Sequence, residues 1–554
     1  MNRHYSLAVV VLAATVLVGA RALAGLERQA ASAEARVDAV LAKWNTTSPG
    51  CAVGVSLKGK SVLEKGSGMA DLEHAVPIRP DTIFEAGSVS KQFTAAAVLL
   101  LARDGKLSLD DQVRKHVPEL PDYGAPLTIR QMLNHTSGLR DWGSVVAIGG
   151  WPRGTRVHTH AHVLDVVSRQ RALNFPSGTR YSYSNTGYNL AAIIVSRVSG
   201  QPFAEFTRAR IFAPLAMTRT SWRDDYTRIV KDRAIAYSDG SGGFATEMPF
   251  ENIHGNGGLL TTVGDLLRWT RNFSQPVVGD AAFVKEEQEP GRFNDGRPHG
   301  YALGLFIGTY QGVREVSHSG ATAGYRAWLS EYPERQLAVA VLCNVSSGNA
   351  TQYAHAVADA YLGLAKPADT ASAVTGGRSN GSAAAPQSTT PQDALAGMYR
   401  RTDTGEPISL SRADSELRVE GGPRLTARSA TRFAAANGPI FDFTTDGLTV
   451  TDRFGTIDTY VRLRRDELAA QPLAGYAGTY DSQEAEVTLI AAVDGDALVL
   501  KRRPDTIIRL TPVYADAFRG SIGFVRFHRD AAGTITSVSV TQDRVWDMRF
   551  TRSR

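Results

Sequence analysis

The chain of 554 residues has few cysteines, no basic cluster and only one long apolar run, and each shortage excludes a class of protein. Two cysteines cannot form the framework of a small disulfide-rich fold. The 61 basic and 55 acidic residues give a formal charge of +6 without a run of lysine or arginine, so nucleic-acid binding has little support. The chain also lacks a His-Glu-x-x-His sequence, which excludes a helical zinc-protease site, and its one Gly-x-Ser-x-Gly, at residues 377–381, lies in a stretch without the strand and helix patterns that a nucleophile elbow needs.

The one long apolar run lies near the N-terminus, at residues 7–20. Arg3 and His4 precede it and Ala22-Leu23-Ala24 follows it, which is the pattern of a secretory signal peptide over residues 1–24, cleaved after Ala24. The run is shorter than the roughly 20 residues that a membrane-spanning helix needs. We therefore expect a periplasmic or secreted protein, which is held at a membrane only if the signal peptide stays uncleaved.

A chain of this length exceeds a single hydrophobic core, and its composition divides the rest of it into parts. Residues 25–366 mix helical and strand patterns, whereas residues 367–392 are rich in Ala, Ser, Thr, Gly and Pro and predict a flexible linker. Beyond the linker, the sequences LAGMY and YAGTY each open a block of short alternating strands. We interpret residues 393–467 and 468–554 as two small antiparallel β-barrels of the lipocalin-like kind.

The two cysteines lie at the ends of strand-like runs. Cys51 begins the run CAVGVSL, and Cys343 ends the run LAVAVLC. If these strands pair in antiparallel fashion, the start of one meets the end of the other and a disulfide can form. Two buried free thiols are the alternative, because cysteine is often buried as a small apolar residue. The sequence leaves both alternatives open.

The stretch EAGSVSKQFTAAAVLL, at residues 85–100, places a lysine in the first turn of a helix that is apolar on nearly every face. Ser88 lies three residues before Lys91, so that the two side chains share a face of a helix. Burial disfavours the charged form of a lysine and lowers its pKa. A hydroxyl beside such an amine at a helix N-terminus is a candidate nucleophile.

Two further motifs follow along the chain. Tyr183-Ser184-Asn185 comes just before an apolar helix, and His318-Ser319-Gly320 ends a strand-like run. The order Ser-x-x-Lys, Tyr-x-Asn and His-x-Gly resembles the serine β-lactamase and penicillin-binding-protein superfamily, and it is most similar to the class C β-lactamase-like branch (peptidase family S12). The stretches IRQMLNHTSGL, IFAPLAMTRTSW and GNGGLLTTVGDLLRW extend the resemblance over about residues 45–350. It implies an α/β (α+β) domain with an antiparallel sheet flanked by helices.

The residue types in these motifs suit acyl transfer without a metal or an organic cofactor. Ser88 would be the nucleophile, and Lys91 or Tyr183 would remove its proton, with the pKa of the lysine lowered by burial and that of the tyrosine lowered by nearby cations. The resemblance implies that Tyr183 also protonates the leaving group and activates the hydrolytic water. Asn185 would hold Lys91 and the substrate carbonyl.

The third motif would bind the substrate. We expect Ser319, Gly320 and Ala321 to line it, with Gly320 leaving room for the substrate to lie along the strand edge as an extra strand. The backbone N–H groups of Ser88 and Ala321 would form the oxyanion hole. His318 stands where the β-lactamase motif usually has lysine. A histidine is mostly neutral at pH 7, which weakens the case for β-lactams and for peptides with a free carboxylate.

His318 in this position, and two barrels after the hydrolase domain, resemble the D-stereospecific aminopeptidases, in which a barrel loop reaches the active site. We therefore expect an exported serine hydrolase that acts on small peptides, amides or esters, cell-wall peptides among them. Cleavage of D-amino-acid substrates is the leading prediction. An esterase, a β-lactamase and a penicillin-binding sensor that does not turn over are the alternatives. Glu484, Asp516 or another acid of the second barrel would meet the substrate amine, and the oligomeric state stays open.

Other histidines invite different interpretations. His158, His160 and His162 have spacing that could suggest a metal site. However, Thr159 is a natural N-cap for a helix that would spread the three imidazoles, so we expect no metal there. His135, in NHTSGL, is expected to be a structural residue of a hydrogen-bonded turn.

Overall fold

The computed structural model describes residues 33–363, 392–413, 416–436, 438–468 and 472–553. The predicted signal peptide, and the predicted linker up to residue 391, lie outside the described residues. Within the described ranges, no helix has both the length and the apolar character that crossing a membrane requires.

The N-terminal domain is built on a six-stranded antiparallel sheet with the order β10-β11-β12-β13-β1-β2. Its strands are β1(Cys51–Leu57), β2(Lys60–Ser67), β10(Phe306–Tyr310), β11(Val313–Thr322), β12(Tyr325–Tyr332) and β13(Leu337–Cys343). Strand β1 is buried on both faces, and its residues alternate between two layers of helices. Val53 and Val55 join a cluster with the helix at residues 33–41 and with α10(Ala350–Leu362), whereas Gly54 faces Val263 on α8(Val263–Ser274).

The remaining helices and short helical turns of this domain cover the sheet and build the second half of the domain. They are η1(Gly87–Val89), α2(Ser90–Arg103), η2(Val113–Lys115), α3(Ile129–Leu133), α4(Trp142–Ile148), α5(His160–Arg169), α6(Asn185–Ser199), α7(Phe203–Thr207), η3(Arg208–Phe212), α8(Val263–Ser274), α9(Ala281–Glu287), η4(Pro333–Arg335) and α10(Ala350–Leu362). Small two- and three-stranded sheets complete it: β3(Met69–Asp71), β4(Val76–Pro77), β5(Phe84–Glu85), β6(Ser221–Trp222), β7(Tyr237–Gly240), β8(Gly243–Thr246) and β9(Leu259–Thr261).

Helix α2 is the centre of this domain. Its alanines and leucines favour a helix, and every residue from Ser90 to Leu101 is buried. Helix α6 packs along it and is buried through Val195. The sequence correctly predicted a helix that is apolar on nearly all sides, and this is why a lysine in its first turn is buried as well.

The two cysteines form a disulfide. Cys51 and Cys343 are direct partners in the antiparallel pairing of β1 with β13, and they are joined across a sequence separation of 292 residues. Of the two alternatives that the sequence left open, the structure has the disulfide. A cross-link over so long a segment restricts the unfolded chain and contributes about 2–4 kcal/mol to stability.

Two closed eight-stranded antiparallel barrels follow, which confirms the predicted fold class. The first, after α11(Gln392–Leu395), consists of β14(Gly397–Arg401), β15(Pro407–Ala413), β16(Glu416–Val419), β17(Arg424–Ala427), β18(Arg432–Ala435), β19(Ile440–Phe443), β20(Gly447–Thr451) and β21(Ile457–Arg462). The second, after η5(Leu473–Tyr476), consists of β22(Gly478–Ser482), β23(Val487–Asp494), β24(Ala497–Arg502), β25(Thr506–Tyr514), β26(Ala517–Gly520), β27(Gly523–Arg529), β28(Ile535–Gln542) and β29(Val545–Arg552).

The repeated LAGMY and YAGTY sequences play the same part in both barrels. Tyr399 and Tyr480 lie on the first strand of their barrels, and each donates a hydrogen bond of 2.8 Å to the carbonyl four residues earlier. An arginine of the last strand, Arg462 or Arg552, donates to a carbonyl just before that first strand. The repeated sequence therefore corresponds to the same hydrogen bonds where the first and last strands of each barrel meet.

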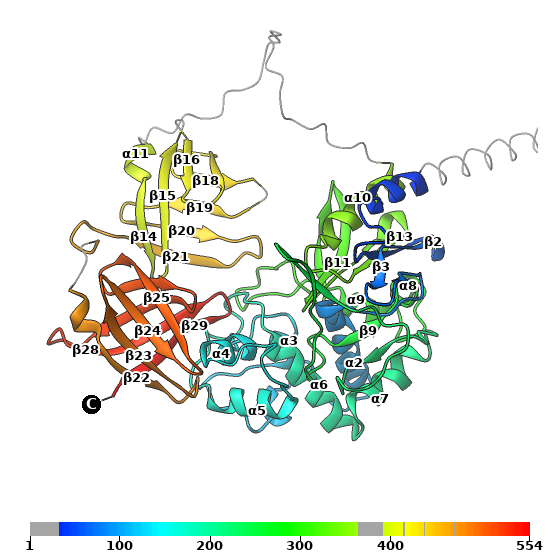
Figure 1. Ribbon diagram of the computed structural model, residues 1–554, viewed down its shortest axis with the longest axis horizontal. Coiled ribbons are helices and arrows are strands. Elements are labelled where there is room, and N and C mark those ends of the chain that lie inside the picture. The colour runs from blue at the N-terminus through cyan, green and yellow to red at the C-terminus, as the bar shows by residue number, and fades with distance from the viewer. Residues whose placement is uncertain (1–32, 364–391, 414–415, 437, 469–471, 554) are drawn as a thin grey trace, which may run out of the picture.

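Both barrels pack against one side of the N-terminal domain (Figure 1). The second barrel is fixed by a buried ion pair of 2.7 Å between Arg140 and Glu484. The first barrel is fixed by its β20–β21 loop, where Phe454 stacks on Tyr181 with ring centroids 4.1 Å apart and Thr456 accepts a hydrogen bond from the Tyr181 amide. These contacts place loops of both barrels over the same edge of the N-terminal domain.

Candidate active site

Ser88 lies on η1, the single turn that precedes α2, and this turn presses against strand β11. Gly87 has φ +51°, and a Cβ added there would lie 2.6 Å from the Ala321 nitrogen. A Cβ on Gly320 would lie 2.0 Å from the carbonyl oxygen of Ala86. Both positions therefore require glycine so that the two backbones can touch. The prediction that Gly320 makes room for the substrate was wrong in its reason, because the space is filled by the Ala86 backbone.

Lys91 contacts three groups at the centre of the site. Its Nζ lies 3.0 Å from Ser88 Oγ, 2.9 Å from Asn185 Oδ1 and 2.7 Å from the Asn256 carbonyl oxygen. The side chain is fully buried, and burial holds the lysine pKa well below its ordinary value, with a further decrease from the nearby Arg544. The expectation of a lowered pKa at Lys91 agrees with this environment.

The partners of Lys91 suit both the neutral amine and the ammonium. The amide oxygen of Asn185 and the carbonyl of Asn256 can only accept hydrogen bonds. A neutral amine has two N–H groups for these two acceptors, and its lone pair is then free to accept a hydrogen bond from the Ser88 hydroxyl. An ammonium would instead donate to all three partners, and it is the lowered pKa that favours the uncharged lysine, which can take the serine proton.

Asn185 is held from behind by residues that the sequence did not single out. Its backbone N–H donates to Asp141 Oδ2 at 2.7 Å, and Asp141 is also the N-cap of α4. Asn189, one turn further along α6, donates to Asn256 Oδ1 at 2.7 Å. Asn185 is therefore the first residue of α6 rather than a residue just before it, with its position fixed through Asp141 and that of Asn256 through Asn189.

Tyr183 lies with the face of its ring toward Lys91, whose Nζ is 4.8 Å from the ring centroid. The guanidinium carbon of Arg544 also lies 4.8 Å from that centroid. Burial nevertheless raises the pKa of Tyr183 above its ordinary value, and hydrogen bonding with Ser88 and the charge of Arg544 offset this only in part. The prediction that nearby cations lower the pKa of Tyr183 was wrong, because desolvation is the larger effect.

His318 is neutral and fully engaged. Its Nδ1 lies 2.6 Å from the Ser319 carbonyl oxygen, which can only accept, so Nδ1 carries the proton. Its Nε2 then accepts a hydrogen bond from the Tyr301 hydroxyl at 2.9 Å. Burial is the main cause that lowers the pKa of His318 to about 3. The imidazole is therefore uncharged at neutral pH, in agreement with the expectation, and neither nitrogen is free for a substrate.

The other histidines serve the scaffold. His135 is buried, its Nδ1 accepts from the Ser184 amide at 3.2 Å and its ring lies 4.2 Å from that of Tyr183, so it positions the second motif. His162 caps Thr159 at the start of α5, while His158 packs on Trp142. His160 contacts His254, while His158 and His162 lie with their ring centroids 5.8 Å apart.

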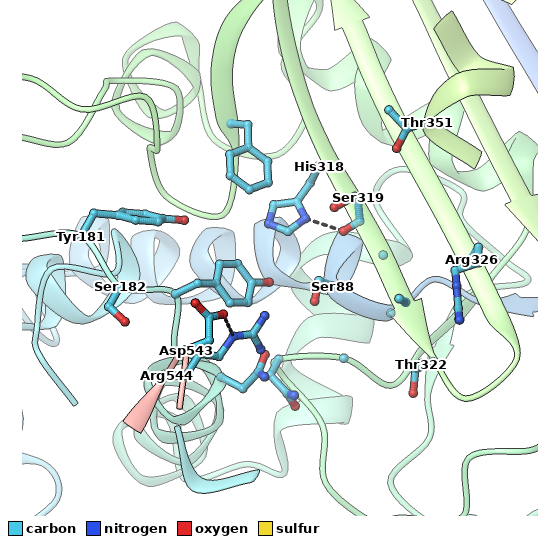
Figure 2. A pocket seen from close by; sticks show the side chains of 18 of the residues that line it. Ser88, Tyr181, Ser182, His318, Ser319, Thr322, Arg326, Thr351, Asp543 and Arg544 are labelled. Atoms are coloured by element: carbon cyan, nitrogen blue, oxygen red, sulfur yellow. Dashed lines mark hydrogen bonds and ion pairs between the residues drawn. The ribbon is translucent and has the colours of Figure 1, made fainter. Parts of the chain in front are cut away.

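A cavity of about 1160 Å³ opens above Ser88 and is lined by Tyr183, Asn185, His318 and the run from Ser319 to Thr322. Strand β10 pairs with β11 only as far as Ser317, so the edge of β11 from His318 onward is not paired by β10. Such an edge can accept an extended peptide as an additional strand. All five residues proposed for chemistry thus meet around Ser88, and Figure 2 shows Ser88 beside the labelled His318 and Ser319.

Both barrels contribute to the walls of this cavity. The first barrel supplies Phe454 and its neighbours, and the second supplies the two-residue turn Asp543-Arg544 between β28 and β29 (Figure 2). No local sequence signal marks this turn, because it reaches the site only through the docking of the barrel. The acids proposed from the sequence are elsewhere: Glu484 pairs with Arg140 and Asp516 pairs with Arg529, and neither lines the cavity. Asp543 is the acid of the second barrel that does.

Comparisons with known proteins agree with this architecture. The sequence profile of the family described as Beta-lactamase matches residues 33–364. The D-aminopeptidase of Gluconobacter oxydans is 30% identical over 467 residues, which cover 82% of this chain and 84% of that protein. The D-aminopeptidase of Brucella canis is 27% identical over 90% of this chain and 94% of its own length. The octameric penicillin-binding protein homologue from Pyrococcus abyssi superposes with a TM-score of 0.55 at 24% identity, over 77% of this chain and 99% of that one.

Proposed function

Because this chain belongs to the β-lactamase family of serine hydrolases, we propose that it cleaves the first peptide or amide bond of substrates with an N-terminal D-residue, through an acyl-enzyme on Ser88. The observation that carries the substrate class is the match to D-aminopeptidases over 82–90% of the chain, which includes the barrels and not only the hydrolase domain. The turn of the second barrel that lines the cavity supports the proposal that the barrels help to determine which substrates bind.

In the proposed acylation step, Lys91 is the general base. Its neutral amine takes the proton of Ser88 across their 3.0 Å hydrogen bond while Oγ forms a bond to the substrate carbonyl carbon. Backbone N–H groups of Ser88 and Ala321 stabilise the oxyanion. Tyr183, whose raised pKa keeps its proton in place, donates that proton to the leaving nitrogen as the C–N bond breaks. The products are the acyl-enzyme, a free amine, a Lys91 ammonium and a Tyr183 phenolate.

In the proposed deacylation step, the same two groups work in reverse. The Tyr183 phenolate removes a proton from a water molecule, whose oxygen attacks the ester carbon. Lys91 returns its proton to Ser88 Oγ as the ester bond breaks, so the carboxylic acid leaves and both residues regain their starting states. The cations at Lys91 and Arg544, each 4.8 Å from the ring centroid, stabilise the phenolate between the two steps.

We also propose export to the periplasm or the medium. The N-terminal signal pattern supports it, and so does the Cys51–Cys343 disulfide, because structural disulfides persist in oxidising compartments. Intact mass of the exported protein tests this proposal: a chain that begins at Gly25 supports it, and a full-length intracellular chain would contradict it.

The substrate proposal is tested with three chromogenic amides: the p-nitroanilides of D-alanine, L-alanine and N-acetyl-D-alanine. We expect turnover of the free-amine D substrate, with kcat/KM roughly 100-fold or more above that of the other two, since a site built around one geometry discriminates through unpaired or clashing groups. Equal turnover of the D and L substrates would contradict the proposal. No turnover, together with a lasting adduct after exposure to a β-lactam, would indicate a penicillin-binding sensor instead.

A further inference from the structure

The third motif supplies no positive charge to the site. His318 holds the position that a lysine usually occupies, but its Nδ1 donates to the Ser319 carbonyl and its Nε2 accepts from Tyr301. With a pKa of about 3, it stays neutral in the range in which the protein would work. A substrate carboxylate near this position therefore needs a positive charge from another part of the molecule.

Arg544 brings such a charge from the second barrel. Its guanidinium covers the Tyr183 ring at 4.8 Å, and its side chain is 37% exposed, so it is both inside the site and within reach of a ligand. In Figure 2, Asp543 and Arg544 lie on one side of Ser88, and Thr322 and Arg326 lie on the other.

The backbone of the turn fixes Arg544 in place. Its carbonyl oxygen accepts hydrogen bonds from the Asp141 amide at 3.2 Å and from Asn174 Nδ2 at 3.1 Å. The next residue but one, Trp546, donates its N–H to Asn174 Oδ1 at 2.8 Å. Asp141 also holds the Asn185 amide, so the turn is tied to the same residue that positions the second motif. The backbone from which the guanidinium extends is therefore held in a defined place.

The charge of Arg544 is available to a ligand. Its ion pair with Asp543 is long, with Nε and Oδ2 separated by 3.8 Å, and the Asp543 side chain is 96% exposed. Such an exposed pair is weak and is easily replaced. Three of the other arginines that line the cavity are already engaged: Arg326 donates to the carbonyls of Ala323 and Tyr325, Arg401 pairs with Asp403 and Asp458, and Arg153 pairs with Glu251.

We propose that Arg544 binds the free carboxylate of the residue that leaves, so that the preferred substrates are short D-peptides, above all dipeptides, rather than amino-acid amides. This inference rests on the proposed function in one respect: Tyr183 protonates the leaving nitrogen, so the leaving residue lies on the Tyr183 side of Ser88. Arg544 lies against that ring. It can therefore meet a carboxylate that is separated from the leaving nitrogen by the α-carbon of the leaving residue. The second barrel thus supplies the carboxylate recognition that the third motif does not provide.

The test uses two substrates that differ only at the C-terminal group, D-alanyl-D-alanine and D-alanyl-D-alaninamide, with the full mature protein. We expect the wild type to favour the acid, and the Arg544→Gln variant to lose about 10- to 100-fold in kcat/KM on the acid, mainly through KM, with little change on the amide. Arg544→Lys is expected to recover part of the loss. Arg326→Gln, which removes an arginine from the other end of the cavity, is the matched control and should keep the preference for the acid.

Three outcomes would overturn the inference: equal turnover of the acid and the amide by the wild type, an equal loss on both substrates in Arg544→Gln, or loss of the preference in Arg326→Gln instead. An equal loss with a shifted pH profile would mean that Arg544 acts through Tyr183 alone. Calorimetric binding of the two ligands to the Ser88→Ala protein, with and without Arg544→Gln, measures the same preference without turnover. A wild type that binds the acid through Arg544 but hydrolyses no D substrate would reject the proposed function and keep only the role of Arg544 in binding a carboxylate.

Discussion

Replacing Ser88 by alanine is expected to lower kcat by on the order of 10⁴-fold or more, because the nucleophile is lost while the rest of the site remains. The side chain lies on the short turn before α2 and makes few contacts, so the fold should be unchanged. Lys91 keeps its bonds to Asn185 and Asn256 in the variant. The measurement is steady-state hydrolysis of D-alanine p-nitroanilide, with the thermal midpoint recorded alongside.

Ser182→Ala is the matched control for Ser88. Ser182 also lines the cavity, but its recorded hydrogen bond is made by the backbone N–H, to the His135 carbonyl. We expect this variant to keep activity within about threefold, as surface and lining changes without a special contact usually do. Residual activity above a few percent in Ser88→Ala would show that the nucleophile is a different residue, and an equally large loss in Ser182→Ala would show that the loss in Ser88→Ala is not specific to the nucleophile.

The second large effect concerns Lys91. Lys91→Met keeps much of the shape of the side chain but removes the proton acceptor, and we expect kcat to fall by roughly 10³-fold, within the range for a positioned general base. The wild-type kcat/KM should fall as the pH drops, because the amine must be neutral to accept the Ser88 proton. Burial places this decrease well below the ordinary lysine pKa. The activity that remains in Lys91→Met should lack that decrease.

Lys91→Arg separates charge from proton transfer. An arginine keeps a positive charge near Asn185 and Asn256 but does not release its proton at any accessible pH. We expect it to be as inactive as Lys91→Met. An active arginine variant would mean that Lys91 acts only as a fixed charge, and Tyr183 would then be the base despite its raised pKa.

The motifs that bring Ser88, Lys91, Tyr183, Asn185 and His318 together could be found in the sequence, because each is short and lies at the start of a helix or on a strand. Their protonation states could be predicted only in part. The lowered pKa of Lys91 follows from one buried helix, which the sequence pattern reveals. The predicted direction of the pKa shift at Tyr183 was wrong. That direction depends on how deeply the ring is buried, and the burial comes from tertiary packing.

The barrels, too, could be predicted only in part. Their number and type could be predicted from the repeated tyrosine sequences, because Tyr399 and Tyr480 make the same local contact. The sequence could not predict which loop of which barrel reaches the site. The docking depends on contacts between distant segments, such as Arg140 with Glu484 and Tyr181 with Phe454. Asp543 and Arg544 occupy an ordinary hairpin turn and have no sequence signal of their own.

The central claim is that Ser88 carries the D-acyl group between two chemical steps, and the most direct measurement is rapid acid quenching followed by peptide mass spectrometry. The protein is mixed with D-alanine p-nitroanilide, quenched within milliseconds and digested. We expect the mass of one D-alanyl group on the peptide that contains Ser88, formed and lost during turnover and missing in Ser88→Ala. Turnover without this adduct, or with the adduct on another residue, would contradict the proposed mechanism.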